Sequence, residues 1–428
     1  MPLSLQDSDI LLHADPTKVL LRPFDLAWES NNDEPSRTER LIAQIMALTP
    51  DEVQIAIYRV HRDFEGRHDH VRDIFLRRAA EIAERAELDI TDWDTTTVEL
   101  LGSYFCQEYS YASAAVTNPS VTLHPDQTGL SAGQQRVLIA MRTVGEGHIS
   151  SIAFREGMVD DCGTFTLQPD PDVSTAASFI RGAQDQPNEG IGIARPASCS
   201  LSETVIFPMT SAQAGGMEDL RITRLMEDDG SFCWMGTYTA YSGHDIQSEM
   251  LVTRDFKTFD LTPMRGDAAR NKGMALFPRK IDGQYAMIAR QDGENLYFIK
   301  SPDPLEWSEG VRILSPKFPW ELVQIGNCGP PIELDEGWLV LTHGVGAMRR
   351  YSIGAALLDK SDPSRVLGRT AKPILSAAEE HRDGYVPNVV YSCGAMRCGD
   401  RLFIPYGIAD SSVGFVFADL KAVLASLV

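Results

Sequence analysis

Two different spacings of apolar residues divide the chain into a helical part and a strand-rich part. Between residues 36 and 88, apolar side chains recur every three or four positions, as at Val53 and Ile57, which is the spacing of one helix face. Capping boxes, in which a hydroxyl residue is followed three positions later by Glu, mark helix starts at Ser36 and Thr49. We therefore expect amphipathic helices whose apolar face packs against the main domain or a second subunit.

From about residue 97 the sequence changes to runs of Val, Ile, Thr, Tyr and Phe separated by Gly, Asp and Pro, which is typical of strands and turns. A polar turn that contains glycine precedes an apolar strand five times. The turn glycines are Gly133, Gly230, Gly283, Gly337 and Gly399. The later spacings, about 50 to 60 residues, are typical of propeller blades. The repeat predicts an all-β fold, a five-bladed β-propeller with an N-terminal α-helical extension; a large β-sandwich with accidental repetition is the alternative.

We place the helical extension, which would serve packing or oligomerisation, at residues 1–96 and the five-bladed propeller at residues 97–428. A polar side chain stands six to nine positions after each turn glycine, and equivalent blades would bring these side chains to one mouth of the central axis. They are Arg142, Tyr238, Arg290, His343 and Tyr406. The segment 155–215 shows no such pattern, and we expect it to lack regular structure.

The composition narrows the possible partners. The 428 residues include 60 acidic and 39 basic side chains, and the formal net charge of −21 opposes binding to nucleic acid or an anionic membrane. No apolar run approaches the roughly 18 to 20 residues that span a bilayer. The start of the chain, Met1 to Asp15, has no basic region, so we expect no signal peptide and a cytoplasmic protein. The seven scattered cysteines are typical of reduced thiols in that compartment.

Three segments combine reactive side chains with glycine and proline in distinctive positions. They are Glu218-Asp219-Leu220-Arg221, the run from Ile325 to Val345 that includes His343, and the run from Leu357 to Arg369. At these segments the chain resembles glycoside hydrolase family 130, the β-mannoside phosphorylases and related β-mannosidases, and the resemblance extends over roughly residues 100–420. It implies a five-bladed propeller and a single inverting displacement at the anomeric carbon of a β-linked mannose.

The resemblance assigns the catalytic acid to Asp219, which would protonate the leaving oxygen through the 3-hydroxyl of the bound mannose. An ordinary inverting glycosidase also needs a base to activate water, whereas phosphate is already an anionic nucleophile, so one acid suffices. The sequence departs from the family at Leu220, where proline is usual. A simple turn ion pair between Asp219 and Arg221 is the structural alternative.

Inorganic phosphate, the expected co-substrate, needs cationic and hydrogen-bonding groups from several sides. The resemblance assigns phosphate binding to Lys272, Arg290, His343 and Tyr351. Taken singly, Lys272 would also fit a solvated turn, Arg290 an ion pair between blades, and His343 a core position. The resemblance assigns the mannose hydroxyls to Asn118, Arg142 and Asp410.

We expect no cofactor beyond phosphate and no metal. Phosphorolysis needs no metal, and His68 and His70, two positions apart, do not share a helix face. His148 would either line the site or cap the strand that follows it, and we expect the cap. Tyr238 and Tyr241 would either stack on the acceptor sugar or belong to the core.

The sequence therefore predicts inverting phosphorolysis of a β-mannobiose or β-manno-oligosaccharide to α-mannose 1-phosphate. Two alternatives stay open. A β-mannosidase would need a second carboxylate to activate water, for which Glu218 and Glu146 are the candidates, and a non-catalytic sugar-binding propeller would need none. The sequence does not determine the linkage or the acceptor sugar. The helical region predicts a homo-oligomer that associates through residues 36–90, and neither nucleic acid nor membrane is an expected partner.

Overall fold

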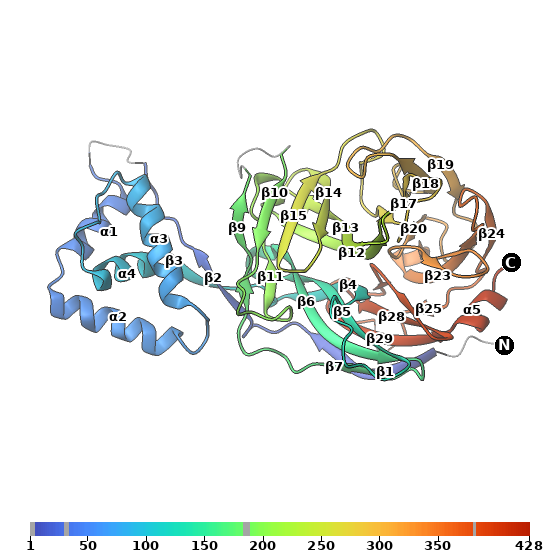
Figure 1. Cartoon of the computed structure of the whole chain (residues 1–428), viewed down its shortest axis with the longest axis horizontal. Helices are drawn as coiled ribbons and strands as arrows, with labels where there is room; N and C mark the ends of the chain where they lie inside the picture. The colour runs from blue at the N-terminus through green and yellow to red at the C-terminus, as the bar shows by residue number, and fades with distance from the viewer. Residues whose placement is uncertain (1–4, 30–33, 183–188, 380–381) are drawn as a thin grey trace. The chain divides into compact units, whose positions relative to one another are not determined.

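Strands dominate the structure, a computed structural model that describes residues 5–29, 34–182, 189–379 and 382–428 (Figure 1). The chain divides into two compact units. The strand unit contains residues 1–16, 111–170 and 177–428, and the helical unit contains residues 17–110 and 171–176. Within the described ranges, no helix is long and apolar enough to cross a bilayer. Strands far outnumber helices among these residues, so the mainly β fold class is confirmed.

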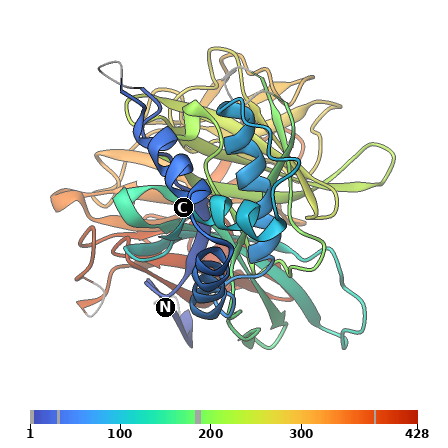
Figure 2. The ribbon, with the colours of Figure 1, turned by 90° about the vertical axis from the view of Figure 1, so that its left-hand side faces the viewer.

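The helical unit follows the predicted amphipathic pattern. Its helices are α1 (Arg37–Met46), α2 (Pro50–Phe64), α3 (Val71–Arg85) and α4 (Thr95–Tyr104), drawn in shades of blue in Figure 2, and its strands are β2 (Val19–Pro23), β3 (Cys106–Ser110) and β8 (Thr175–Ala176). Both predicted capping boxes are present. The Ser36 hydroxyl accepts from the backbone N–H of Glu39, and the Thr49 hydroxyl accepts from the third residue of α2 in the same way. These local hydrogen bonds define where α1 and α2 begin.

Helix α4 departs from the strand character expected after residue 97. Its β-branched residues favour a strand, but Asp94 caps the helix by accepting a backbone hydrogen bond from its first turn. Leu100 is fully buried in the core of the helical unit. Gly102 lets α4 approach α3 closely, because a Cβ at this position would lie 1.8 Å from the carbonyl oxygen of Phe75. Packing against α3 therefore outweighs the local preference.

Within the described residues the strand unit forms four sheets, almost entirely antiparallel. The largest runs in the order β4 (Ala115–Leu123), β5 (Gln134–Val144), β6 (Ser150–Asp160), β12 (Gly216–Met226), β13 (Phe232–Tyr241), β14 (Ile246–Thr253), β15 (Thr258–Pro263), β10 (Ile191–Ala194) and β9 (Ser178–Arg181). Strands β7 (Phe165–Leu167) and β11 (Thr204–Ile206) also pair with β6.

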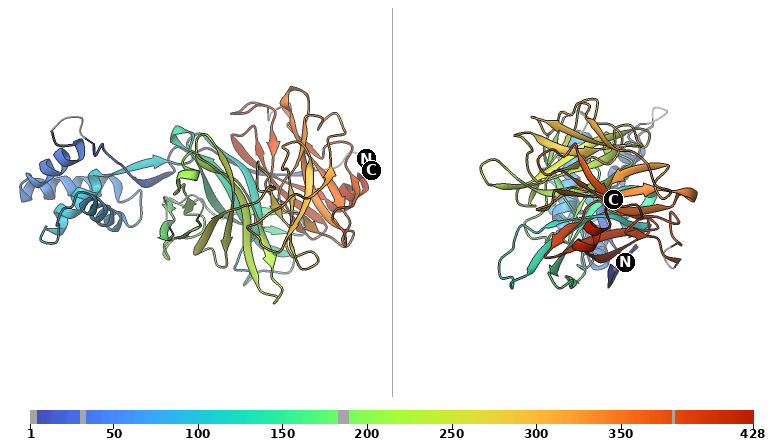
Figure 3. Two further views of the ribbon diagram at one scale, coloured as in Figure 1. Left: turned by 90° about the horizontal axis from the view of Figure 1, so that it is seen from above. Right: turned by 90° about the vertical axis from the view of Figure 1, so that its right-hand side faces the viewer.

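The other three sheets follow in chain order, and Figure 3 shows them from two further directions. One contains β16 (Ala275–Leu276), β17 (Tyr285–Ala289), β18 (Leu296–Ser301) and β19 (Val311–Leu314). The next contains β20 (Gln324–Asn327), β22 (Trp338–Val345), β23 (Tyr351–Leu358) and β24 (Val366–Arg369), with β21 (Ile332–Glu333) and β25 (Leu375–Ser376). The last contains β1 (Leu5–His13), β29 (Ser412–Asp419), β28 (Arg401–Ile408), β26 (Val390–Tyr391) and β27 (Met396–Cys398), and α5 (Leu420–Ala425) follows β29.

Each of the five predicted turn glycines leads into a strand. The strands are β5, β13, β17, β22 and β28, and φ at the glycines is positive, from 58° at Gly399 to 148° at Gly337. The largest sheet contains two of the repeated strand groups, β4–β6 and β12–β15. A single parallel bridge between Gly216 and Ser150 joins these two groups. The turn-and-strand repeat is therefore confirmed in all five copies.

The first residues belong to the strand unit. β1 pairs antiparallel with β29, with Leu5 opposite Ala418 and His13 opposite Ser412. The structure thus differs from the predicted boundary after residue 96, because β1 extends the last sheet and α4 continues past this residue. Most positions of β1 are polar and at least partly exposed, so the segment lacks the apolar run that marks a strand in the sequence.

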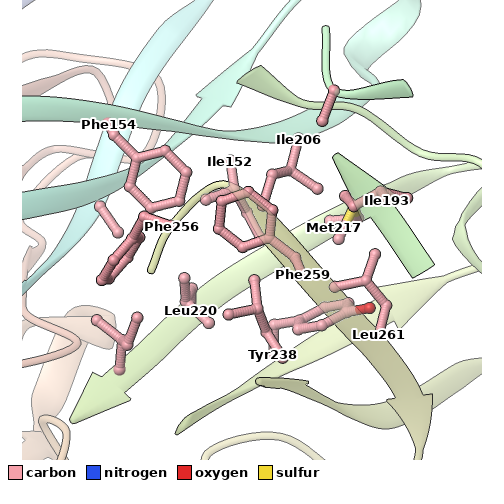
Figure 4. Packing of buried hydrophobic residues seen from close by; sticks show 14 of the residues in the cluster. Ile152, Phe154, Ile193, Ile206, Met217, Leu220, Tyr238, Phe256, Phe259 and Leu261 are labelled. Atoms are coloured by element: carbon pink, nitrogen blue, oxygen red, sulfur yellow. The ribbon is translucent and has the colours of Figure 1, made fainter. Parts of the chain in front are cut away.

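The segment 155–215 contains regular structure, so the prediction for it was wrong. It holds the end of β6 and the strands β7, β8, β9, β10 and β11, while residues 183–188 lie outside the described residues. Ile193 of β10 is fully buried and packs in one cluster with Phe154 and Phe259 (Figure 4). Strands β7 and β9–β11 are only three or four residues long, which is too short to show a period.

Replacing the turn glycines by alanine should test how closely the repeats pack. A Cβ at Gly337 would lie 2.2 Å from the carbonyl oxygen of Leu358, whereas Gly283, at the same position of another copy, has no atom within 4 Å of its added Cβ. We expect Gly283→Ala to cost about 1 kcal/mol for its left-handed backbone, and Gly337→Ala to cost roughly 2 kcal/mol more. Urea unfolding followed by tryptophan fluorescence measures both, and equal midpoints would contradict this packing.

Candidate active site

Two bulged strands turn an asparagine and an aspartate toward each other. The β4–β5 pairing shifts register at Asn118, and the β12–β13 pairing shifts register at Asp219. Both residues have left-handed backbones, with φ of 49° and 61°. A bulge bends its strand and redirects the side chain it carries. As a result, Asn118 Nδ2 donates a hydrogen bond of 2.7 Å to Asp219 Oδ1.

Leu220, the position at which the resemblance implies proline, is accommodated by the core beneath this bulge. Its side chain is buried in the same cluster as Tyr238 and Phe256 (Figure 4). Gly236 on β13 leaves room for it, because a Cβ there would lie 2.8 Å from Leu220 Cδ1. Leucine is therefore compatible with the backbone that presents Asp219.

Arg142 and Lys272 reach two adjacent carboxylates. Arg142 Nη2 lies 2.7 Å from Glu218 Oε1, and Arg142 Nη1 lies 3.6 Å from Asp219 Oδ1. Arg142 Nε donates to Ser150 Oγ at 2.9 Å, which orients the guanidinium. Lys272 Nζ contacts the second oxygen of Glu218, Oε2. Each carboxylate oxygen of Glu218 thus contacts a cationic side chain, and Arg142 contacts both Glu218 and Asp219.

Asp219 and Asp410 have opposite pKa shifts. Burial raises the pKa of Asp219, but Arg142, Arg221 and the hydrogen bond from the neighbouring amide outweigh burial and hold this pKa below its ordinary value. Burial and the charge of Asp219 raise the pKa of Asp410. Thr117 Oγ1 lies 3.3 Å from Asp410 Oδ1 and connects this carboxyl to the β4 bulge. In the resting site Asp219 is therefore ionised, and Asp410 retains its proton more readily than an ordinary aspartic acid does.

Arg221 holds the backbone of the bulge. Its side chain is 1% exposed, Nη1 donates to the Asp219 carbonyl oxygen at 2.9 Å, and Nη2 donates to the Tyr391 hydroxyl at 2.7 Å. The simple turn ion pair considered from the sequence is therefore not the contact that joins Arg221 to Asp219. Arg221 instead connects the acid to an aromatic group.

That aromatic group consists of Tyr391, His343 and Tyr351. The ring centroids of His343 and Tyr391 are 4.8 Å apart, and those of His343 and Tyr351 are 5.9 Å apart with nearly parallel planes. His343 Nδ1 lies 3.1 Å from the carbonyl oxygen of Asn327. Burial and the charge of Arg290 hold the pKa of His343 well below its ordinary value, so the imidazole is neutral.

Arg290 follows β17 and carries two buried N–H donors, Nε and Nη1, that no protein atom accepts. An unsatisfied buried guanidinium is uncommon and fits a site for an anionic ligand. Within the residues that the structure describes, Arg290 forms no ion pair, so the structural alternative of a salt bridge between blades is not observed. Gly326 makes room for the neighbouring His343 ring, since a Cβ there would lie 2.1 Å from His343 Cε1.

The structure brings the predicted site residues into one connected group. Asn118, Arg142, Asp219, Lys272 and Asp410 are linked by direct contacts or through Thr117 and Glu218. His343 and Tyr351 join them through Tyr391 and Arg221, and Arg290 acts on the charge state of His343. Sequence reasoning missed Tyr391, which lies in the two-residue strand β26, too short for any periodic signal.

Two of the five strand-end side chains, Tyr238 and Tyr406, belong to buried clusters. Tyr238 is 2% exposed, and its hydroxyl contacts Glu249 inside the core. Tyr406 is 4% exposed in another buried cluster. The His148 ring stacks on Tyr385, with ring centroids 5.8 Å apart.

No three His, Cys, Asp or Glu side chains gather as a metal site in the described part of the chain. Buried His68 instead pairs with Glu108, with Nε2 lying 2.7 Å from Oε1.

A family model described as beta-1,4-mannooligosaccharide phosphorylase, that of glycoside hydrolase family 130, matches residues 192–427. A beta-1,2-mannobiose phosphorylase of Listeria innocua is 31% identical over 231 residues, which cover 52% of this chain and 63% of that protein. A beta-1,2-mannobiose phosphorylase of Thermoanaerobacter is 36% identical over 216 residues, which cover 49% of this chain and 69% of that protein. The solved structure of the Listeria innocua phosphorylase with beta-1,2-mannobiose shares the fold, with a TM-score of 0.52 and 22% identity over 73% of this chain and 92% of that one.

These matches cover the site residues unequally. The chain spans 63% of the length of the Listeria innocua relative. Asp219 and Asp410 lie inside the family match, whereas Asn118 and Arg142 precede its first residue, 192. The structure nevertheless brings both of these earlier residues to the Asp219 carboxylate.

Asp219→Asn and Asp410→Asn should shift stability in opposite directions. Because the folded-state pKa of Asp219 is lowered, its carboxylate stabilises the fold above the unfolded pKa of about 4, and this contribution is lost as the pH falls. Because the pKa of Asp410 is raised, its ionisation opposes folding as the pH rises. At neutral pH, Asp219→Asn should therefore lower the melting temperature and Asp410→Asn should raise it.

Calorimetry between about pH 7 and pH 3 checks this, because both differences should shrink as the two acids become protonated. Shifts of the same sign at neutral pH would show that the assigned charge states are wrong.

Proposed function

This chain belongs to glycoside hydrolase family 130, and we propose that it cleaves a β-linked mannoside by inverting phosphorolysis. The products are α-mannose 1-phosphate and a sugar shortened by one mannose. The observation that carries the proposal is the pair of unpartnered, buried N–H donors of Arg290 in the same connected group as Asp219. The relatives named mannoside phosphorylases support the same reaction.

We further propose that the five strand groups are the blades of a five-bladed β-propeller. The five copies of the turn-and-strand repeat support this, as does the origin of the site residues in successive sheets. The pairing of β1 with β29 would then join both ends of the strand unit in the last blade. A propeller does not require any one sheet to close on itself, because its blades are separate sheets.

Phosphate would bind at Lys272, Arg290, His343 and Tyr351. The free donors of Arg290 fit phosphate oxygens, which accept charge-assisted hydrogen bonds. His343 Nδ1 faces a carbonyl oxygen and must carry the proton to donate to it, so Nε2 is left as an acceptor. A neutral His343 would therefore accept the hydroxyl of a phosphate monoanion. Phosphate is the attacking group, and no protein base is needed to activate it.

Asp219 would supply the proton for the leaving oxygen. It is ionised in the resting site, where the surrounding cations dominate. Bound phosphate adds negative charge beside the same cations and bound sugar excludes water, and both effects raise the pKa of Asp219 toward that of a proton donor. A phosphate oxygen then bonds to the anomeric carbon as the glycosidic bond breaks on its opposite face. The proton passes to the leaving oxygen through the mannose 3-hydroxyl, as the family resemblance implies.

Asn118, Arg142 and Asp410 would hold the mannose. Their amide, guanidinium and carboxyl groups are fixed beside Asp219 by direct contacts or through Thr117. Planar groups held in this way can bind two neighbouring hydroxyls at once.

The arrangement argues against the alternative of β-mannoside hydrolysis. An inverting hydrolase needs a carboxylate free to take a proton from water. Both oxygens of Glu218 are engaged by Arg142 and Lys272, and Glu146 lies in an exposed turn. Neither candidate is placed as a base beside Asp219.

We also propose a cytoplasmic homo-oligomer that needs no cofactor beyond phosphate. The seven free thiols fit a reducing compartment. Ile55 and Tyr58 on α2 are 53% and 67% exposed, and this apolar surface would fit a second copy of the helical unit.

Phosphorolysis is tested by incubating the full chain with β-1,2- or β-1,4-mannobiose, with and without phosphate. We expect mannose 1-phosphate to form only when phosphate is present. Asp219→Asn should lower kcat by about 10²- to 10⁴-fold, the usual contribution of a general acid. Equal turnover without phosphate would favour a β-mannosidase, and a chain inert toward both sugars would favour a non-catalytic binding protein.

Arg290→Gln should raise the KM for phosphate by about tenfold or more, because it removes charge-assisted hydrogen bonds. The KM for mannobiose should change little. Arg279→Gln is the matched control, since Arg279 is already paired with Glu333 through bonds of 3.0 and 2.8 Å. An unchanged KM for phosphate in Arg290→Gln would remove this arginine from the phosphate site.

A further inference from the structure

One buried asparagine connects the three segments that carry proposed phosphate-binding side chains. Asn327 ends strand β20 and is 1% exposed. Its side-chain nitrogen, Nδ2, donates to the carbonyl oxygen of Gly273 and, at 3.2 Å, to the carbonyl oxygen of Ile288. Its backbone carbonyl oxygen lies 3.1 Å from His343 Nδ1. The residue therefore connects the loop before β16 with strands β17 and β22.

These contacts lie within two positions of each proposed phosphate ligand. Lys272 directly precedes the glycine whose carbonyl oxygen is bound, and Arg290 lies two positions after Ile288. The third contact is made by the His343 ring itself. One residue thus fixes where an ammonium, a guanidinium and an imidazole begin relative to one another.

The amide of Asn327 is fully used in these contacts. Carbonyl oxygens can only accept, so the atom that faces two of them must be the NH₂ group. The side-chain oxygen, Oδ1, accepts from the backbone N–H of Gly329 at 3.1 Å. Because both hydrogens of the amide are directed at the backbone, Asn327 acts on a ligand only through the residues that it positions.

A second asparagine holds the other end of the lysine turn. Asn271 has a left-handed backbone with φ of 62°, and its Nδ2 donates to the carbonyl oxygen of Gln291. Gln291 directly follows Arg290 in the chain. Lys272 therefore lies between two anchored residues. The residue before it is bonded to the end of the arginine segment, and the residue after it is joined to the start of that segment through Asn327.

The spacing of the backbone is important because the lysine side chain is flexible. The Lys272 side chain is 39% exposed, and its Nζ contacts Glu218 Oε2. Where such an ammonium can reach depends on where the backbone holds the base of its long stem. A nucleophile must be held in a geometry close to that of attack, and a misplacement of about 1 Å can cost about 10²-fold in rate.

We propose that Asn327 and Asn271 are positioning residues for the phosphate nucleophile. Through backbone hydrogen bonds they hold Lys272, Arg290 and His343 at the spacing that one phosphate ion requires. This inference rests on the proposed function, because that function makes these three side chains phosphate ligands.

The test measures phosphorolysis of mannobiose by variants of the full chain. Asn327→Leu keeps nearly the same side-chain shape but removes both donors, and Asn271→Gly removes the amide while permitting the left-handed backbone. Each should raise the KM for phosphate about fivefold to tenfold, because the phosphate ligands lose their fixed spacing. The KM for mannobiose should stay within about twofold. A merely structural role would lower the amount of active protein and leave both KM values unchanged.

Gln127→Met is the matched control. Gln127 Nε2 also bridges two carbonyl oxygens, those of His124 and Arg136, at 2.8 and 2.7 Å, and its Oε1 accepts from a backbone N–H at 3.0 Å. Arg136 precedes Arg142 on β5 by roughly 20 Å of extended strand, so this amide lies far from the site. The control should lose thermal stability and keep both KM values.

An unchanged KM for phosphate in either asparagine variant would remove that asparagine from the assignment. An equal rise in the control would show a general effect of lost stability and overturn the proposal. If circular dichroism shows that Asn327→Leu does not fold, Asn271→Gly decides the outcome.

A wild type whose turnover does not depend on phosphate would contradict the proposed function and leave the positioning role measurable. Isothermal titration calorimetry with orthophosphate then compares the same variants. Weaker binding in the asparagine variants but not in Gln127→Met supports the positioning role. Equal binding in all variants, or no binding by the wild type, overturns it.

Discussion

The burial of two adjacent carboxylates at a strand bulge is the constraint around which this site is organised. Glu218 and Asp219 are 7% and 8% exposed, and two buried acids side by side are strongly unfavourable unless cations and hydrogen bonds compensate them. Arg142 and Lys272 supply that compensation from other segments of the strand unit. Because these cations come from segments far apart in the sequence, the acids can be buried only when the sheets have assembled.

The contacts with these cations also give the two acids different roles. Glu218 takes one contact from each cation and so offsets part of the positive charge of Arg142 and Lys272 in the resting site. Arg290 keeps buried N–H donors without a partner, so an anion that enters the site can accept hydrogen bonds from them. In the proposed reaction, the bound phosphate raises the pKa of Asp219, because its negative charge offsets the cations that keep Asp219 ionised. A formal net charge of −21 describes the surface and does not prevent such a local cationic group.

Residues at equivalent positions of the repeat show which site residues the sequence pattern can predict. Arg142, Arg290 and His343 all join the site group, as the repeat predicts, whereas Tyr238 is buried with its hydroxyl on Glu249. The pattern identifies strand ends, but it does not determine on which side of a strand the core continues. Tyr391, which links Arg221 to His343, carried no local signal at all.

The sequence by itself determined the helices of residues 36–88, the five turn-and-strand copies and most of the candidate site residues. Capping boxes, turn glycines and apolar periods act within a few residues, and the chemical groups of a site can be recognised by resemblance. Only the tertiary structure decided that β1 joins the last sheet, that α4 is a helix, and that His148 stacks on Tyr385. Each of these depends on contacts between segments distant in the chain, which no local pattern encodes. The ionisation state of Asp219 also depends on the tertiary structure, because it is set by cations that only the assembled sheets bring close to its carboxylate.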